Sequence, residues 1–150
     1  MCLGMKLSDR SLSRYKATGK KTGYIRVWKC VIKGPTHYRG YVWERFYKKG
    51  FAHAKQRAVS EQQLIHAFRS QAAAKNYQRH DTSHWENVVV IQCIVKPQWV
   101  MAIGLTSLKK KTLTTKAIVM PAYPKTRVTV AEFRAAIKGK KIQKYSWEKI

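Results

Sequence analysis

The apolar residues of this chain are densest in residues 64–105, whose sequence is LIHAFRSQAAAKNYQRHDTSHWENVVVIQCIVKPQWVMAIGL. At its centre, residues 88–95 are β-branched at six of eight positions and carry no charge, which is typical of a strand buried on both faces. A Lys-Pro pair ends this strand. Before it, Ser70 can cap a short helix over residues 71–77, where three alanines favour helix. The predicted centre of the fold is a helix followed by a buried strand.

Further strands are expected around this central one. Residues 24–32, 99–103 and 116–120 are short apolar runs that end near Gly or Pro. Residues 105–115 carry lysines among Ser and Thr, which indicates a loop between strands. Residues 61–69 fit two structures, a helix with capping-box spacing and a short strand, so periodicity leaves both open.

A second helix is predicted near the C-terminal end. Thr129 and Glu132 have the spacing of a capping box, in which each side chain accepts a hydrogen bond from the backbone N–H of the other residue. Apolar residues recur from Phe133 with helical spacing, and Gly139 stands where the helix should end. This pattern predicts a short amphipathic helix.

The length of 150 residues suits one domain, and 45% hydrophobic residues argue against wholesale disorder. We expect a single α+β domain over residues 23–139, with a mixed or mostly antiparallel sheet, two short helices and basic termini. Residues 1–22 are predicted to form a basic arm, either mobile in solution or ordered on a partner. Residues 140–150 are predicted to form a basic tail.

The charge balance indicates the class of partner. Lys and Arg number 31 against 7 Asp and Glu, a net charge of +24, and residues 87–131 contain no acid. Such self-repulsion does not favour folding, so a polyanion is the expected partner. The candidate nucleic-acid-binding residues are Lys109, Lys110, Lys111, Lys116, Arg39, Arg45, Lys48, Lys49, Lys140 and Lys141.

Aromatic and basic residues alternate in residues 37–50. On a regular strand, Tyr41, Trp43 and Tyr47 share one face. Rings on an exposed face can stack on the bases of a single strand while cations hold its phosphates. Aromatic residues are also good strand formers that pack into cores, and we expect this for Trp43.

The cysteines and histidines do not indicate a metal site or a cofactor. Cys2, Cys30 and Cys93 are widely spaced and odd in number, so we expect reduced thiols that pack as small apolar residues. No histidine completes a zinc-binding pattern with them. No apolar run approaches the ~20 residues that span a bilayer. The N-terminus lacks an apolar signal region, so secretion is not expected.

Several short motifs resemble a group of small uncharacterised proteins encoded by phages and large DNA viruses. These motifs are the opening Met-Cys-Leu, the strand GYIRVWK at residues 23–29, the HAFRS turn at residues 66–70 with its Ala-rich helix, and the valine-rich strand at residues 88–95. The resemblance covers most of residues 1–120 and implies a viral origin, without an established activity.

The same order of elements distantly resembles ADP-ribosyltransferase-like folds. The resemblance implies that His66 matches the histidine on the nicotinamide side and that Arg26 contacts a nucleotide. Leu64 and Ile65 stand where that motif has Gly-Phe, and no Glu stands where the catalytic carboxylate belongs. A transferase therefore has no identifiable general base or charge stabiliser here, and catalysis is not the preferred interpretation.

The preferred hypothesis is non-catalytic binding of nucleic acid or another polyanion, by a virus-encoded protein associated with a genome or virion. The alternatives are a structural component of a large assembly, such as a minor capsid or ribosomal protein, and a degenerate ADP-ribosyltransferase-like enzyme. Basic tails serve binders and assembly components alike, so the sequence does not separate these two. The expected setting is a virion or the host cytoplasm, with nucleic acid and other proteins of the assembly as partners and no membrane.

Overall fold

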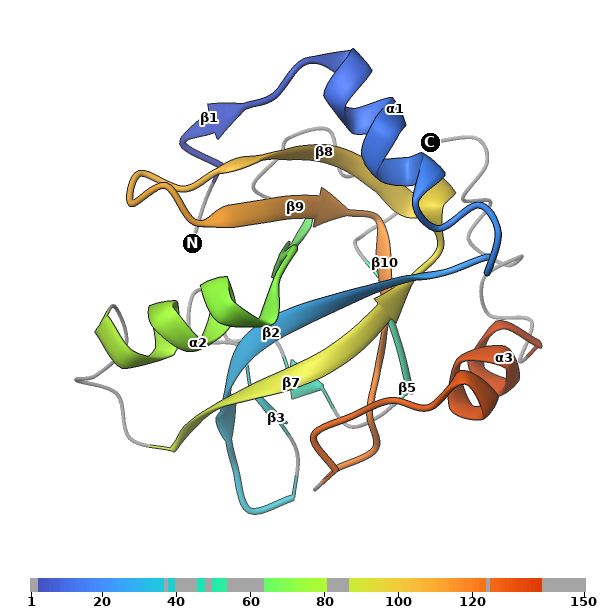
Figure 1. Ribbon diagram of the computed structural model, residues 1–150. Helices are drawn as coiled ribbons and strands as arrows, with labels where there is room; N and C mark the ends of the chain where they lie inside the picture. The colour runs from blue at the N-terminus through green and yellow to red at the C-terminus, as the bar shows by residue number, and fades with distance from the viewer. Residues whose placement is uncertain are drawn as a thin grey trace.

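Two long strands form the centre of the sheet. In the computed structural model, β2 (Ile25–Lys33) and β7 (Val88–Val95) pair antiparallel over eight residue pairs (Figure 1). Val27, Val31 and Ile91 are completely buried between this pair and the rest of the core. The predicted central strand over residues 88–95 is confirmed. Its first three residues are half-buried, however, so burial on both faces is wrong for that end.

The structure describes residues 3–36, 38–39, 46–47, 50–53, 64–80, 87–123 and 125–138, with 46–47 and 50–53 as backbone only. The predictions for Tyr41, for the side chains of Trp43 and Tyr47, and for the tail over residues 140–150 lie outside this description.

All strands of the described residues belong to one sheet, and its paired strands run antiparallel. Its order is β1 (Met5–Lys6), β8 (Val100–Leu105), β9 (Lys111–Thr115), β6 (Ile65–Phe68), β2, β7, β10 (Ala117–Met120) and β5 (Gly50–His53). A further strand, β3 (Tyr38–Arg39), pairs with both β2 and β4 (Phe46–Tyr47). The predicted α+β domain with a mostly antiparallel sheet is confirmed.

The consecutive strands β9 and β10 lie in different parts of the sheet. β9 pairs with β6 and β8, whereas β10 pairs with β7 and β5. Lys116 connects them and donates its backbone N–H to the Trp99 carbonyl at 2.9 Å. Strands on both sides of this connection bury residues in the same cluster, including Leu113 of β9 and Ile118 of β10. The sheet therefore curves around one core.

The helix α2 (Gln71–His80) covers one end of the β2–β7 pair. The Ser70 hydroxyl accepts a hydrogen bond from the Ala73 backbone N–H at 3.1 Å, which confirms the predicted cap. Ala74 is completely buried against Cys30 and Phe68. The helix runs three residues beyond the predicted end at Tyr77, and in this extension the half-buried Gln78 donates from Nε2 to the Val88 carbonyl of β7 at 2.8 Å.

The helix α3 (Val130–Lys138) begins at the predicted capping box. The Thr129 hydroxyl accepts from the Glu132 backbone N–H at 3.2 Å, and the Glu132 carboxylate accepts from the Thr129 backbone N–H at 2.8 Å. Phe133 is buried, and its ring centroid lies 6.4 Å from that of Trp99. Trp99 closes the short 3-10 turn η2 (Pro97–Trp99), so α3 packs beside the end of β7.

The predicted N-terminal arm is instead part of the fold, which is a correction to the sequence analysis. Residues in it form β1, which pairs with β8, and the helix α1 (Asp9–Ala17). The Ser8 hydroxyl caps α1 by accepting from the Ser11 backbone N–H at 3.2 Å. Leu12 and Tyr15 pack against the core. The sequence analysis missed α1 because most of its residues are polar. Only a few of its side chains, such as Leu12 and Tyr15, pack against the core.

The predicted loop over residues 105–115 is also corrected, because it forms a hairpin. β8 extends to Leu105, and β9 begins at Lys111, so only the turn between them is irregular. The alternative left open for residues 61–69 is resolved within the described residues, where β6 is a strand between β2 and β9.

Cys30 and Cys93 are buried free thiols. Burial raises the pKa of Cys93 to about 12, while the charge of Lys29 acts in the opposite direction. Cys30 donates a hydrogen bond to the Ala74 carbonyl at 3.3 Å. Among the helices of the described chain, none is long and apolar enough to cross a membrane.

Candidate nucleic-acid interface

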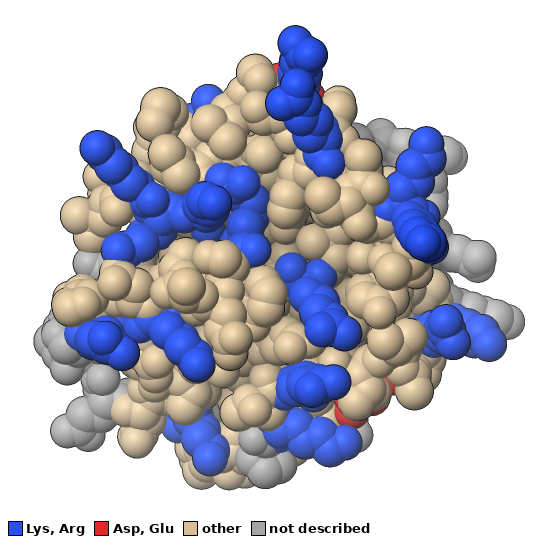
Figure 2. All heavy atoms as spheres, viewed as in Figure 1, with Lys and Arg blue, Asp and Glu red and all other residues tan. Residues whose placement is uncertain are grey.

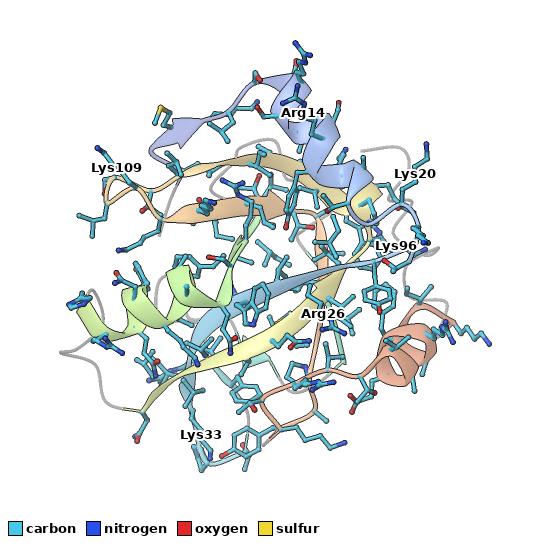
Figure 3. All side chains as sticks on the ribbon, viewed as in Figure 1. Arg14, Lys20, Arg26, Lys33, Lys96 and Lys109 are labelled. Carbon is cyan, nitrogen blue, oxygen red and sulfur yellow. The ribbon has the colours of Figure 1, made fainter. Side chains whose placement is uncertain are left out.

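Cations dominate the face of the molecule that Figure 2 shows. Lys and Arg are spread over most of it, whereas Asp and Glu occupy small areas at its edges. Figure 3 labels six of these cations, and we call the surface they mark the basic face. They are Arg14, Lys20, Arg26, Lys33, Lys96 and Lys109.

The acidic residues of the described chain are Asp9 and Glu132, at the starts of α1 and α3. Glu132 forms an ion pair with Lys125, with 3.2 Å between Oε1 and Nζ. The Thr129 backbone N–H lowers the pKa of Glu132 most, and Lys125 lowers it further. This carboxylate therefore serves its own helix cap and Lys125, and it forms no ion pair with another cation of the described residues.

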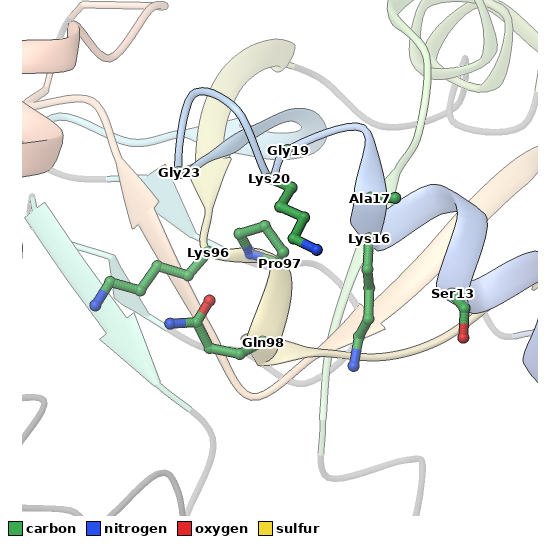
Figure 4. Close-up of a pocket in the computed structure, with 9 residues that line it drawn as sticks. All are labelled: Ser13, Lys16, Ala17, Gly19, Lys20, Gly23, Lys96, Pro97 and Gln98. Carbon is green, nitrogen blue, oxygen red and sulfur yellow. The ribbon is translucent and has the colours of Figure 1, made fainter.

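An open pocket of about 700 Å³ lies between the end of α1 and the turn η2 (Figure 4), and its lining residues Lys20 and Lys96 lie at one edge of the basic face in Figure 3. We call it the lysine pocket, because three lysines from two distant segments of the chain line it. They are Lys16 of α1, Lys20 of the turn after α1, and Lys96 at the end of β7. Gly19, Pro97 and Gln98 are also part of its lining.

Close backbone packing shapes the wall of the lysine pocket. The Gly19 N–H donates to the Lys16 carbonyl at 3.1 Å, and the Gly23 N–H donates to the Gly19 carbonyl at 2.7 Å. A Cβ atom at Gly19 would lie 2.5 Å from Ile25 Cγ1 and 2.8 Å from Pro97 Cγ. Only glycine fits there without a shift of these neighbours. Gly23 has φ +84°, a left-handed conformation that also favours glycine.

The lysines of the pocket have no acidic partner in the described part of the chain. Lys96 Nζ lies 5.7 Å from the centre of the Trp99 ring, a cation–π contact that orients the side chain but leaves its charge. In Figure 4, Lys16 and Lys20 extend on one side of Pro97, and Lys96 and Gln98 extend on the other. Ammonium groups in this arrangement attract anions, and they can donate hydrogen bonds to phosphate oxygens.

Of the predicted lysines at residues 109–111, Lys109 and Lys110 lie on the turn between β8 and β9, and Lys111 begins β9. The Lys109 N–H donates to the Thr106 carbonyl at 2.9 Å, and Lys109 has a left-handed φ of 60°. Lys110 is half-buried, and its ammonium donates to the Asn76 side-chain oxygen on α2. Lys109 and Lys111 are exposed. The structure therefore leaves two of these three lysines open to a partner.

The other predicted site residues are not brought together with this turn. Lys116 is only 7% exposed, because it lies in the buried connection between β9 and β10 and not on the surface. Arg39 is exposed at the end of β3. The predicted residues outside the described ranges are Arg45, Lys48, Lys49, Lys140 and Lys141.

A second polar cluster lies between α1 and the sheet. Arg69 donates from Nε to the Thr112 carbonyl and from Nη2 to the Gly104 carbonyl, each at 3.0 Å. Its guanidinium lies 5.7 Å from the centre of the Tyr15 ring. Burial raises the pKa of Tyr15 well above its usual value. Arg69 therefore ties β6, β8 and β9 together under α1, and we do not count it among the cations offered to a ligand.

His66 and Arg26, which the distant resemblance to ADP-ribosyltransferase-like folds implies as site residues, lie on different strands. His66 is half-buried in β6 opposite Thr114, and its carbonyl accepts from Lys29 Nζ at 2.7 Å. Arg26 is exposed in β2 opposite Ile94. The two described carboxylates stand at helix starts, so neither belongs to the strand pair that carries these residues.

Sequence reasoning missed the lysine pocket. The sequence analysis assigns Lys16 and Lys20 to an arm, and it assigns Lys96 to a strand end within the acid-free interval without naming it as a site residue. A weak indication exists, since Lys16 and Lys20 are four residues apart and a Lys-Pro pair marks a turn at a strand end. Comparison with protein-family models, curated proteins and solved structures finds no match to this chain.

Proposed function

We propose that this protein binds nucleic acid through the basic face and does not act on it chemically. The observation that carries the proposal is the lysine pocket, which Lys16, Lys20 and Lys96 line without a carboxylate among the described lining residues. Further cations, such as Arg26 on β2 and Lys109 on the hairpin, extend the same charge across the face (Figure 3).

The physical argument concerns the cost of gathering these charges. Ammonium groups that surround one hollow repel each other, and the described chain supplies no compensating acid there. A nucleic-acid backbone removes this repulsion, and each phosphate that a lysine neutralises releases its condensed cations into solution. The distribution of lysines over a broad face, and not at one point, suits a partner that carries one charge per nucleotide. The resemblance to virus-encoded proteins extends the proposal to a viral genome as that partner.

The salt dependence of binding tests the proposal. A labelled single-stranded oligonucleotide is titrated with the full chain at increasing NaCl, and affinity is read from fluorescence anisotropy. We expect log affinity to fall linearly with log salt, with a slope of about −0.7 for each phosphate neutralised. A peptide nucleic acid of the same base sequence has no phosphates and should not bind.

A flat salt dependence, or equal binding of the uncharged analogue, would overturn the proposal. The absorbance ratio of the purified protein, before and after a high-salt wash, gives an independent reading. Nucleic acid that co-purifies and leaves with salt is the expected result, and its sequence then tells whether a viral genome supplied it.

A further inference from the structure

We propose that the lysine pocket binds a single nucleotide unit through its terminal phosphate monoester. The inference rests on the proposed function, because it assigns one subsite of the same interface. An extended backbone needs only a charged surface, whereas this pocket of about 700 Å³ is large enough to hold a small molecule. Pockets that bind small ligands and cofactors span about 300–1,000 Å³.

The charge of the pocket favours a terminal phosphate over an internal one. A phosphate monoester carries about −1.5 to −2 charges at neutral pH, since its second pKa is about 6, whereas an internal diester carries one. Lys16 and Lys20 lie on the same side of Pro97, from the last turn of α1 and the turn that follows it (Figure 4). These two lysines, with no carboxylate among the described lining residues, supply the two positive charges that balance a dianion.

The opposite side of the pocket suits the rest of a nucleotide. Pro97 and Gly19 form an apolar surface between the two sides, and Gln98 is exposed beside them. A carboxamide offers both donors and an acceptor, which is what the edge of a base requires. Lys96 lies on the same side as Gln98, where it can neutralise a second phosphate in a longer ligand.

The first experiment uses adenosine 5′-monophosphate as the probe with the full chain. Amide chemical shifts are followed by NMR, with adenosine and inorganic phosphate as separate titrants. We expect adenosine 5′-monophosphate to shift the amides of Gly19, Gly23 and Gln98. Adenosine should bind at least about tenfold more weakly, because it lacks the charge-assisted hydrogen bonds. Equal binding of adenosine and its monophosphate would overturn the proposal.

The second experiment uses a charge-matched pair of variants. Lys16→Gln with Lys20→Gln removes two exposed or half-exposed lysines four residues apart, and Lys75→Gln with Arg79→Gln removes two exposed cations at the same spacing on α2. We expect the pocket variant to lose at least about tenfold in affinity for the monophosphate, and the α2 variant to keep it. Equal losses would mean that only overall charge matters, and would overturn the pocket.

Melting temperatures of both variants show whether the fold is kept. Lys16→Arg with Lys20→Arg should restore binding, because both positive charges are present again. Gln98→Ala gives a second test that leaves all lysines in place. It should weaken adenosine 5′-monophosphate but leave inorganic phosphate unchanged. If Gln98→Ala changes neither, the base side of the proposed site is wrong.

Strand ends and free nucleotides are distinguished by two oligonucleotides that differ only at the 5′ end. If strand ends are the source of the ligand, the 5′-phosphorylated strand should bind more tightly than its 5′-hydroxyl form and displace adenosine 5′-monophosphate. If only the free monophosphate binds, the pocket serves free nucleotides. If the protein binds strands in a salt-dependent way but does not bind the monophosphate, this inference alone is wrong. If it binds the monophosphate but no strand, the proposed function is wrong.

Discussion

The lysines of the hairpin turn and the lysines of the pocket show opposite relations between sequence and space. Lys109, Lys110 and Lys111 are adjacent in the chain, yet their surroundings differ. Lys109 has the left-handed φ of the turn, Lys110 donates a hydrogen bond to Asn76, and Lys111 begins β9. Lys20 and Lys96 are far apart in the chain, yet they line one pocket. A run of charge in the sequence therefore does not locate a charged site, because backbone geometry sends neighbouring side chains in different directions.

The largest expected effect is the difference between charge reversal in the lysine pocket and charge reversal in the hairpin turn. Lys16→Glu with Lys20→Glu and Lys109→Glu with Lys111→Glu change the net charge equally. If the lysines of the pocket form the stronger site, the pocket variant should lose about tenfold more affinity for a 5′-phosphorylated single strand, measured by anisotropy. An equal loss in the two variants would end the distinction between the regions.

The next effect concerns the wall of the pocket. Gly19→Ala should cost about 1–3 kcal/mol of unfolding free energy, because the added methyl group overlaps the Ile25 and Pro97 side chains. Urea unfolding measures this change. Gly23→Ala is the control for backbone strain, since nothing lies within 4 Å of its added Cβ and only the left-handed φ opposes it. A loss of about 1 kcal/mol is expected there, and a larger loss than at Gly19 would contradict the tight wall.

A smaller effect of opposite sign is expected in the hairpin. Lys109 has φ 60°, so Lys109→Gly should stabilise the fold by about 0.5–1 kcal/mol. Lys111→Gly removes the same charge from an ordinary strand position, and it should destabilise the fold by about 0.5–1 kcal/mol. Urea unfolding of the two variants separates backbone strain from charge. Destabilisation by both changes would show that the left-handed turn is misplaced.

The smallest expected effect concerns Glu132. Its carboxylate forms an ion pair with Lys125, whereas the lysines of the pocket have no acidic partner among the described residues. The pKa of Glu132 is lowered in the folded protein from an ordinary value of 4.5, so its contribution to stability is present above that pH and is lost as pH falls through the folded pKa. The wild type should lose this contribution on acidification, and Glu132→Gln should not. Melting temperatures of both proteins between neutral and strongly acidic pH make the comparison, and parallel curves would exclude the effect.

The elements that the sequence analysis predicted correctly are those with dense apolar patterns or complete caps. The strand over residues 88–95 and the capped starts of α2 and α3 belong to this group. β9 was missed because its buried positions are mostly threonines. Thr112, Thr114 and Thr115 are completely buried by neighbours on both sides of the strand, which a polar sequence conceals.

The candidate site was less accessible to sequence reasoning than the fold. The excess of positive charge predicted a polyanion as the partner, but it could not choose among the lysines. Lys116 belongs to a basic interval of the sequence and is buried by the crossing from β9 to β10. Lys96 became a site residue because α1 packs beside η2, a contact between distant segments that no local pattern contains.

The crossing between β9 and β10 also has a kinetic consequence. Strands β6, β2 and β7 lie between these two neighbours in the sheet order, so β9 and β10 can both dock only after distant parts of the chain have paired. The entropy cost of closing such long loops arises before the stabilising long-range contacts form, and this cost slows folding. Since β2 and β7 pair across a long stretch of chain, with Ile25 opposite Val95, whereas β8 and β9 form a local hairpin, we expect the hairpin to form before the β2–β7 pair. The lysine pocket joins Lys20 to Lys96, so we expect it to form with the long-range pairing and not with the hairpin.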